Sequence, residues 1–128
     1  MDASTEEILK RFEESWIETE ARLKSLIDDN PMSSHLIPLY SFIRKLKQRA
    51  ENKNFRTDST FKYPLIFSRS INQVLRRDQK FIKIEASDNF FIATLRDADK
   101  MYREYRVKEL EDERLTGLLE TLKDVLID

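Results

Sequence analysis

The chain has 128 residues, 40% of them hydrophobic and 37% charged, and it carries a formal net charge of −1 at pH 7. This length suits a single domain over residues 1–128, and the balance of apolar and charged residues predicts a folded core under a highly charged surface. One Gly excludes glycine-rich phosphate-binding loops, and the absence of Cys excludes disulfides and thiolate metal sites.

Two amphipathic helices are predicted at the start of the chain. Apolar residues recur at helical spacing along residues 4–28, and the segment DDNP ends this helix. A second apolar stripe predicts a helix that begins near Ser33 or Ser34 and runs to about Asn52. Two such helices joined by a short Pro-containing turn are expected to form an antiparallel hairpin.

Residues 53–69 are predicted to be partly extended. The run FKYPLIFS is apolar like a buried strand, but Pro64 cannot donate to a sheet ladder, so an edge or irregular position is expected. The apolar spacing from Ile71 to Leu75 then predicts a short helix through Asp78.

Three strand-like runs follow: KFIKIEA, FFIATLR and MYREYRV, separated by the turn segments SDN and DADK. Alternation in the first run places its isoleucines on one face and Lys83 and Glu85 on the other. In the third run, Met101, Tyr105 and Val107 are expected to share one face. The three runs predict an antiparallel meander.

The last segment returns to helical spacing, with a leucine-rich stripe after Leu115 and Glu111 or Asp112 near its N-cap. The predicted fold is therefore α+β. It comprises an N-terminal helical hairpin, a short central helix, a three-stranded antiparallel meander and a C-terminal helix, with a fourth edge strand as the alternative for residues 53–69.

Few residues are suited to catalysis. His35 is the single histidine, which excludes histidine-based metal triads, and its place near a helix start favours a surface or capping role. Asp97 and Asp99 in the DADK turn are the carboxylates considered as ligands of a metal-dependent hydrolase. Because Asp also favours turns for local hydrogen bonding, the structural role is preferred. No catalytic residue, metal ligand or cofactor is predicted.

Charge is distributed unevenly along the chain. Residues 41–83 carry twelve basic and three acidic side chains, whereas acidic residues predominate in 1–40 and in 84–128. The stretch RKLKQRAENKNFR at 44–56 holds six of the basic residues. The residues predicted to bind a polyanion or a partner are Arg49, Arg56, Arg69, Arg76, Arg77 and Lys80.

The basic residues of the second helix do not form one row. At 100° per residue they point to different azimuths around the apolar stripe, which favours a solvated rim and a complement to the helix C-terminus over a phosphate-binding surface. The leading hypothesis is a small non-enzymatic binding or regulatory protein that acts on another protein or self-associates. The alternative is a nucleic-acid-associated regulator that uses the central basic patch, and a carboxylate-metal hydrolase ranks third.

The expected location follows from composition. No apolar run approaches the roughly 20 residues that span a bilayer, and the initial MDASTEEI is acidic and lacks an apolar core. Together with the lack of Cys, this predicts a protein of the reducing cytosol without membrane contact.

Overall fold

The computed structural model describes residues 5–60, 63–70, 79–87, 89–97, 100–125 and 127. Helices and an antiparallel sheet confirm the predicted α+β class. The described elements are α1 (Thr5–Asp29), the 3-10 helix η1 (Pro31–Leu36), α2 (Ile37–Gln48), the 3-10 helix η2 (Glu51–Lys53), β1 (Arg56–Asp58), β2 (Leu65–Ser68), β3 (Lys80–Ala86), β4 (Phe91–Asp97), β5 (Lys100–Val107) and α3 (Glu113–Leu122).

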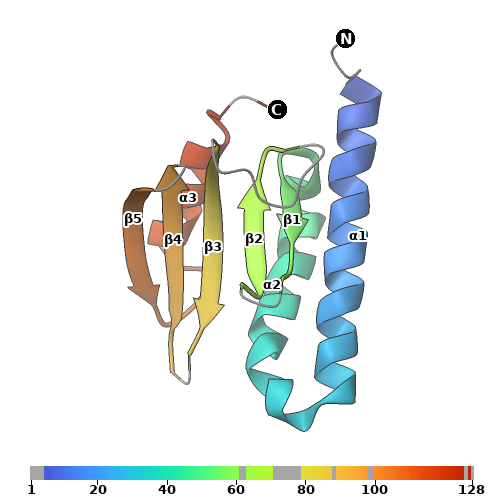
Figure 1. The fold of residues 1–128 in the computed structure, drawn as a ribbon, viewed down its shortest axis with the longest axis vertical. Coiled ribbons are helices and arrows are strands. Elements are labelled where there is room, and N and C mark those ends of the chain that lie inside the picture. The colour runs from blue at the N-terminus through green and yellow to red at the C-terminus, as the bar shows by residue number, and fades with distance from the viewer. Residues whose placement is uncertain are drawn as a thin grey trace.

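The described strands form one five-stranded sheet in chain order, and every neighbouring pair is antiparallel (Figure 1). Behind this sheet in Figure 1 lie α2 and α3, while α1 runs alongside β1 at one edge. The predicted three-stranded meander is present as β3, β4 and β5. It is extended by β1 and β2, which come from the stretch predicted only to be partly extended.

The hydrophobic core lies between the helices and the face of the sheet that they cover. Alternate residues of β2, β3 and β4 point into this core, namely Leu65, Phe67, Ile82, Ile84, Ala93 and Leu95. Phe67 lies at its centre, with ring centroids of Trp16, Phe42 and Phe55 at 5.8, 6.5 and 6.4 Å. Each such aromatic pair contributes about 0.5–1.5 kcal/mol beyond burial, so these contacts tie α1 and α2 to the sheet.

Side chains of α1 bind the outer edge of β1. The indole Nε1 of Trp16 donates to the carbonyl oxygen of Phe55 at 2.7 Å. The backbone N–H of Thr57 donates to Ser15 Oγ at 3.1 Å, and Thr19 Oγ1 donates to the carbonyl oxygen of Thr57 at 3.0 Å. Edge strands present backbone groups that need partners. Here Ser15 and Thr19 supply those partners for Thr57, and Trp16 supplies one for Phe55, the residue before the strand.

Residues 65–68 do not form the edge strand that Pro64 suggested. Strand β2 is buried at all four positions and pairs with β1 on one side and β3 on the other. The prediction was wrong because Pro64 precedes the strand, which begins at Leu65, so the missing proline N–H removes no ladder bond.

The second helix is shorter than predicted. It is preceded by η1, and α2 ends at Gln48, four residues before the predicted end at Asn52. Ala50 has φ 63°, in the left-handed region, and so stops the helical path. A non-Gly residue in this region is uncommon, and nothing in the sequence pattern announced it.

The alternation predicted for the third strand is broken by an irregularity. The pairing of β4 with β5 shifts between Leu95 and Arg96, which face Arg103 and Met101. Tyr102 is the extra residue of this bulge, so Met101 lies on the face opposite Tyr105 and Val107. The expectation that these three side chains share a face was therefore wrong for Met101.

Several other predictions made from the sequence are confirmed, and one falls on residues that the structure does not describe. Helix α1 spans almost the predicted residues, and Ile82 and Ile84 point into the core as expected. Asp112 caps α3, since its carboxylate accepts from the N–H of Arg114. The short helix predicted through Asp78 lies outside the described residues. No helix in the described ranges is long and apolar enough to span a membrane.

Replacing Ser15 with Ala is expected to lower the free energy of unfolding by about 1–3 kcal/mol, because the N–H of Thr57 loses its acceptor at a fully buried position. Urea denaturation measures this change. Ser25→Ala is the matched control, since Ser25 is exposed and bonds to an exposed carboxylate. It should change stability by less than about 0.5 kcal/mol. Equal losses in the two variants would contradict the role given to Ser15.

Replacing Ala50 with Gly is expected to raise the free energy of unfolding by about 0.5–1 kcal/mol, because Gly adopts a positive φ without steric cost. The same denaturation experiment applies. Ala21→Gly, at an exposed position inside α1, should instead lower stability by about 1 kcal/mol. A loss of stability in both variants would show that Ala50 bears no strain.

Candidate functional site

Two of the predicted binding residues have acidic partners within the chain. Arg49 Nη2 lies 3.1 Å from Glu111 Oε2. Arg56 donates two hydrogen bonds to the carboxylate of Asp58, at 2.8 and 3.2 Å, and its side chain is only 15% exposed. Both guanidinium groups are therefore already paired with a carboxylate, which makes them less available to a phosphate.

The cations of α2 are also engaged by acidic residues. Arg44 and Lys47 both reach Glu20 of α1, at 3.4 and 3.3 Å. These ion pairs connect the two helices and are exposed, so each adds at most about 1 kcal/mol to stability. Four of the six basic side chains of residues 44–56 therefore form ion pairs within the protein.

Of the remaining predicted residues, the structure describes Arg69 and Lys80. Arg69 is half-buried at the end of β2, where burial lowers the pKa of its guanidinium although Asp124 opposes this effect. Lys80 Nζ lies 5.5 Å from the centre of the Tyr102 ring. Arg76 and Arg77 lie outside the described residues. A surface that joins them to Arg49 and Arg56 stays a prediction.

A different basic surface appears along β5. The segment Lys100 to Lys108, here named the β5 edge, holds four basic side chains and one acidic side chain. The basic ones, here named the edge cations, are Lys100, Arg103, Arg106 and Lys108. All four are exposed, and none forms an ion pair with an acidic side chain within the described part of the chain.

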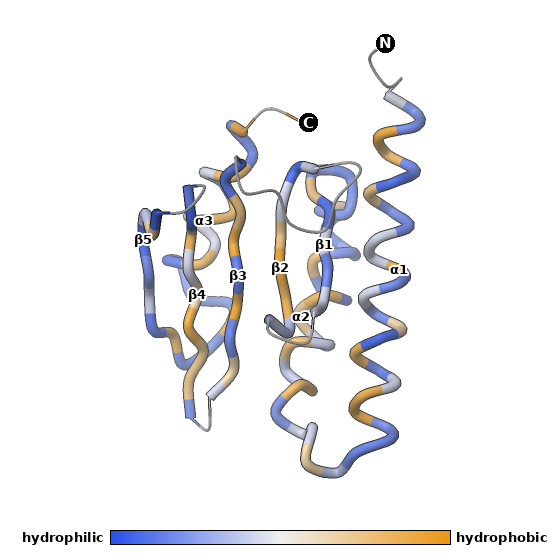
Figure 2. Tube along the Cα trace, in the orientation of Figure 1, coloured by the Kyte–Doolittle hydropathy of each residue, from blue (hydrophilic) through white to orange (hydrophobic). Residues whose placement is uncertain are grey.

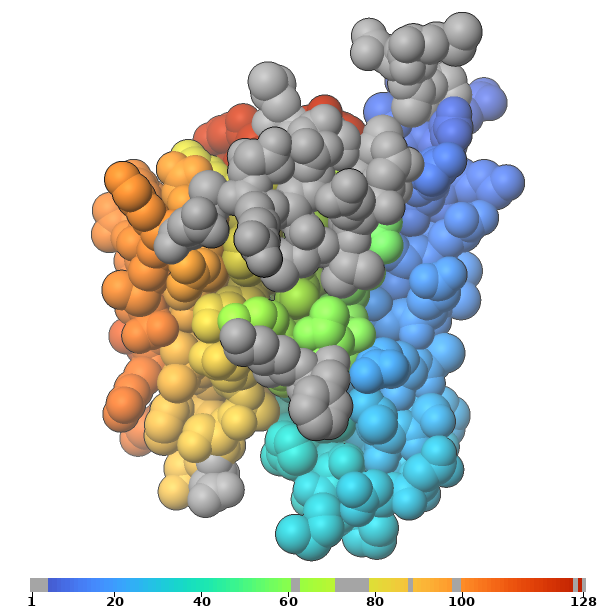
Figure 3. Space-filling view, viewed as in Figure 1, coloured from blue at the N-terminus to red at the C-terminus, as the bar shows by residue number. Residues whose placement is uncertain are grey.

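The β5 edge is also the uncovered side of the sheet. Among the described strands, β5 pairs with β4 alone, and seven of its eight residues are at least partly exposed. Residues of β5, in orange, line the left side of the molecule in Figure 3. Figure 2 shows that β5 is mostly hydrophilic where β2 is hydrophobic. The opposite edge at β1 differs, since α1 packs against it.

Aromatic rings support guanidinium groups along this edge. The guanidinium carbon of Arg106 lies 4.8 Å from the centre of the Phe90 ring. Arg103 lies 5.7 Å from the centre of Tyr102 in the same way. Such stacking contributes about 0.5–1 kcal/mol at exposed sites and leaves the N–H groups at the guanidinium rim available for anions.

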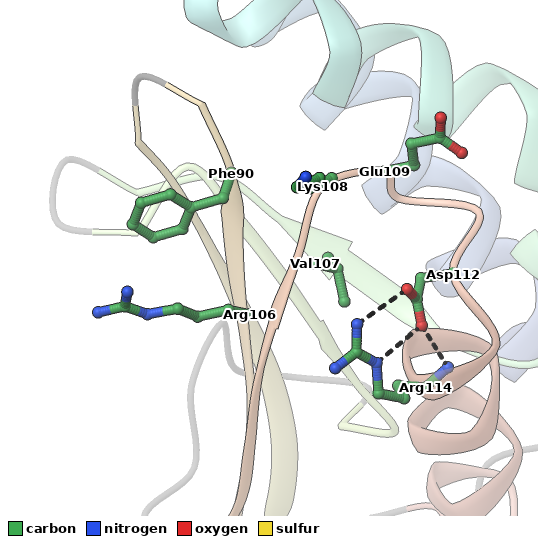
Figure 4. Close-up of a pocket in the computed structure, with 7 residues that line it drawn as sticks. All are labelled: Phe90, Arg106, Val107, Lys108, Glu109, Asp112 and Arg114. Carbon is green, nitrogen blue, oxygen red and sulfur yellow. Dashed lines mark hydrogen bonds and ion pairs between the residues drawn. The ribbon is translucent and has the colours of Figure 1, made fainter.

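A groove of about 530 Å³ lies at the C-terminal end of β5. Figure 4 shows Phe90 beside Arg106 on one side of it and Asp112 joined to Arg114 on the other. The carboxylate of Asp112 accepts three bonds from Arg114, at 2.8, 3.0 and 3.1 Å, and these bonds lower its pKa. Arg114 is thereby paired, whereas Arg106 and Lys108 form no ion pair with an acidic side chain among the described residues.

Asp58 carries the most perturbed carboxyl group among the described residues. Burial raises its pKa to about 6, and the hydrogen bonds from Arg56 oppose this effect without cancelling it. The nearby charge of Glu18 on α1 raises the pKa further. This carboxylate lies on β1, at the edge that α1 covers, so it belongs to the helix–sheet contact and not to the β5 edge.

The residues considered for catalysis or metal binding are placed only in part. No group of three His, Cys, Asp or Glu in the described ranges is placed to hold a metal ion. Asp97 is exposed at the end of β4, while Asp99 lies outside the described residues, so their joint role stays untested. His35 is exposed, with Nδ1 3.1 Å from the carbonyl oxygen of Met32, as a local surface role requires.

Comparisons with protein-family models, with curated proteins and with solved structures gave no match for this chain. Reasoning from the sequence overlooked the edge cations because residues 84–128 as a block are acidic. A finer signal was present: the nine positions 100–108, which include the last predicted strand, hold four basic residues and one acidic residue.

The stability of the protein is expected to fall as pH rises through about 6, because folded Asp58 holds its proton more tightly than an ordinary Asp with a pKa of 3.8. The contribution of the protonated group is complete below about pH 4 and is lost above its folded pKa. Between about pH 4 and 7, wild type should lose about 2 kcal/mol relative to Asp58→Asn. Urea denaturation of both proteins across this range measures the difference. Parallel pH profiles would contradict the assignment.

Proposed function

We propose that this chain is a small cytosolic, non-enzymatic regulatory protein that binds another protein through the β5 edge. One observation carries the proposal: a strand of eight residues, paired on one side only among the described strands, displays exposed cations that lack acidic partners there. The described residues offer neither a neighbouring strand to these backbone groups nor a carboxylate to these cations, and a protein partner would supply both.

The charge of the β5 edge indicates the charge of the partner. With four basic and one acidic side chain, the segment attracts an acidic surface and speeds encounter with it through long-range steering. Helix α1, at the opposite edge of the sheet in Figure 1, holds eight acidic and four basic side chains. This separation of charge orients an approaching acidic protein toward β5 and away from α1.

Nucleic acid is the less supported partner. Of the residues predicted to bind it, Arg49 and Arg56 are paired with carboxylates, and Arg69 is half-buried. Phosphate contacts need several cations that are free at once, since each adds its own increment to salt-dependent affinity. The edge cations are free in the described structure, so nucleic acid remains an outcome that the experiment must distinguish.

The double variant Arg103→Glu/Arg106→Glu is expected to lose its protein partner, because it reverses the charge of two exposed edge cations that make no internal ion pair among the described residues. Affinity purification of the tagged full chain from its own source organism, followed by mass spectrometry and nucleic-acid quantification, measures this. A defined protein should be at least about tenfold depleted relative to wild type.

The matched control is Lys10→Glu/Lys53→Glu, which makes the same charge change at exposed positions of α1 and η2. It should retain the partner. Circular dichroism melting confirms that both variants fold. Recovery of the same protein by all three forms, or recovery of nucleic acid in place of a protein, would overturn the proposal.

A further inference from the structure

We infer that an acidic, extended segment of the partner adds to β5 as a sixth strand of the sheet. The inference rests on the proposed function and specifies the kind of contact: a backbone ladder supported by charge pairs. Addition of a strand to an exposed sheet edge is a common mode of peptide recognition, in which main-chain bonds provide affinity and side chains provide specificity.

The two edges of the sheet differ in the state of their backbone. At β1, the side chains of Ser15, Trp16 and Thr19 bond to backbone groups of Phe55 and Thr57. At β5, within the described residues, pairing with β4 uses one side of the strand. In an antiparallel pair, alternate residues direct N–H and C=O away from the neighbour, so β5 presents a regular set of donors and acceptors.

The bulge defines where the added strand lies. It falls at Met101 and Tyr102, and a bulge distorts the ladder and turns the edge. From Arg103 to Val107 the pairing with β4 is regular, residue by residue. A sixth strand can therefore pair with β5 at these positions, and the groove next to Val107 accommodates its end.

The edge cations require acidic residues in that strand. Arg103 shares a face of the sheet with Tyr105, whereas Arg106 lies on the opposite face, so both faces of an added strand meet a guanidinium. Opposite charges on neighbouring strands stabilise pairing by about 0.2–1 kcal/mol each. Lys108 continues the positive charge into the groove.

A second copy of this chain is a poor occupant of the same edge. Pairing β5 with another β5 brings four cations and one acidic residue against an identical set. Like charges on adjacent strands destabilise pairing. Basic residues and bulges are also devices by which proteins prevent self-association of sheet edges. A segment rich in Asp or Glu removes the repulsion that excludes the copy.

The test uses the full chain and a synthetic seven-residue peptide of glutamate and valine, with glutamates on both faces of the extended peptide, labelled for fluorescence anisotropy at low salt. Two further peptides carry N-methyl groups, one on the odd residues and one on the even residues. Because only alternate N–H groups of an added strand face β5, one methylated peptide should bind at least about tenfold more weakly than the other. Amide exchange at residues 103–107 should slow on binding, and Arg103→Glu/Arg106→Glu should bind at least about tenfold more weakly.

Several results overturn the inference. These are equal affinities of the two methylated peptides, absence of binding by the unmodified peptide, tighter binding of a lysine–valine peptide, and preference for a duplex oligonucleotide. Dimerisation of the free chain through β5, seen by sedimentation and abolished by Arg103→Glu/Arg106→Glu, does so too. The proposed function fails separately, when partner capture is insensitive to that variant. If capture depends on β5 while the methylated peptides bind equally, side-chain docking replaces strand addition.

Discussion

The hydrogen bonds between α1 and the outer backbone of β1 are the constraint on which the arrangement of this protein depends. Ser15 and Thr19 bond to the outward backbone groups of Thr57, in a three-residue strand that is too short to be stable alone. Trp16 bonds to Phe55, the residue before this strand. The indole of Trp16 also contacts Phe67 in the aromatic cluster, so the same helix covers the sheet edge and packs into the core. Because α1 closes that edge, β5 is left as the accessible end of the described sheet.

Charge follows the same asymmetry. The acidic helix α1 neutralises part of the basic α2 through Glu20, and Glu111 and Asp58 bind Arg49 and Arg56. These pairs engage four of the twelve basic side chains of residues 41–83 with carboxylates inside the protein. The edge cations, which belong to a block that is acidic overall, keep their charge for the surroundings. The net charge of a stretch of sequence says little about the charge of a surface, because neutralisation depends on which side chains meet in space.

The regular elements were predictable because their signals are local. The 3.6-residue period of α1 and the alternation in β3 follow from the geometry of each element, and both patterns describe the structure. The errors arose where the conformation of a residue depends on the residues around it and not on the repeating pattern of its segment. Pro64 predicts an edge position for this segment, but it lies one residue before β2 and so removes no hydrogen bond of the strand. Ala50 reads as a helix residue, yet it adopts a left-handed conformation that ends α2. Met101 follows an alternation that the bulge at Tyr102 breaks.

By itself, the sequence determined the α+β class and the positions of α1, β3 and α3, because composition and periodicity act within single elements. Tertiary structure alone decided which cations are free and which sheet edge is covered. Arg49 meets Glu111 across 62 positions of the chain, and Trp16 meets Phe55 across 39. Contacts of this range depend on how the elements pack, and no local pattern of residues encodes them.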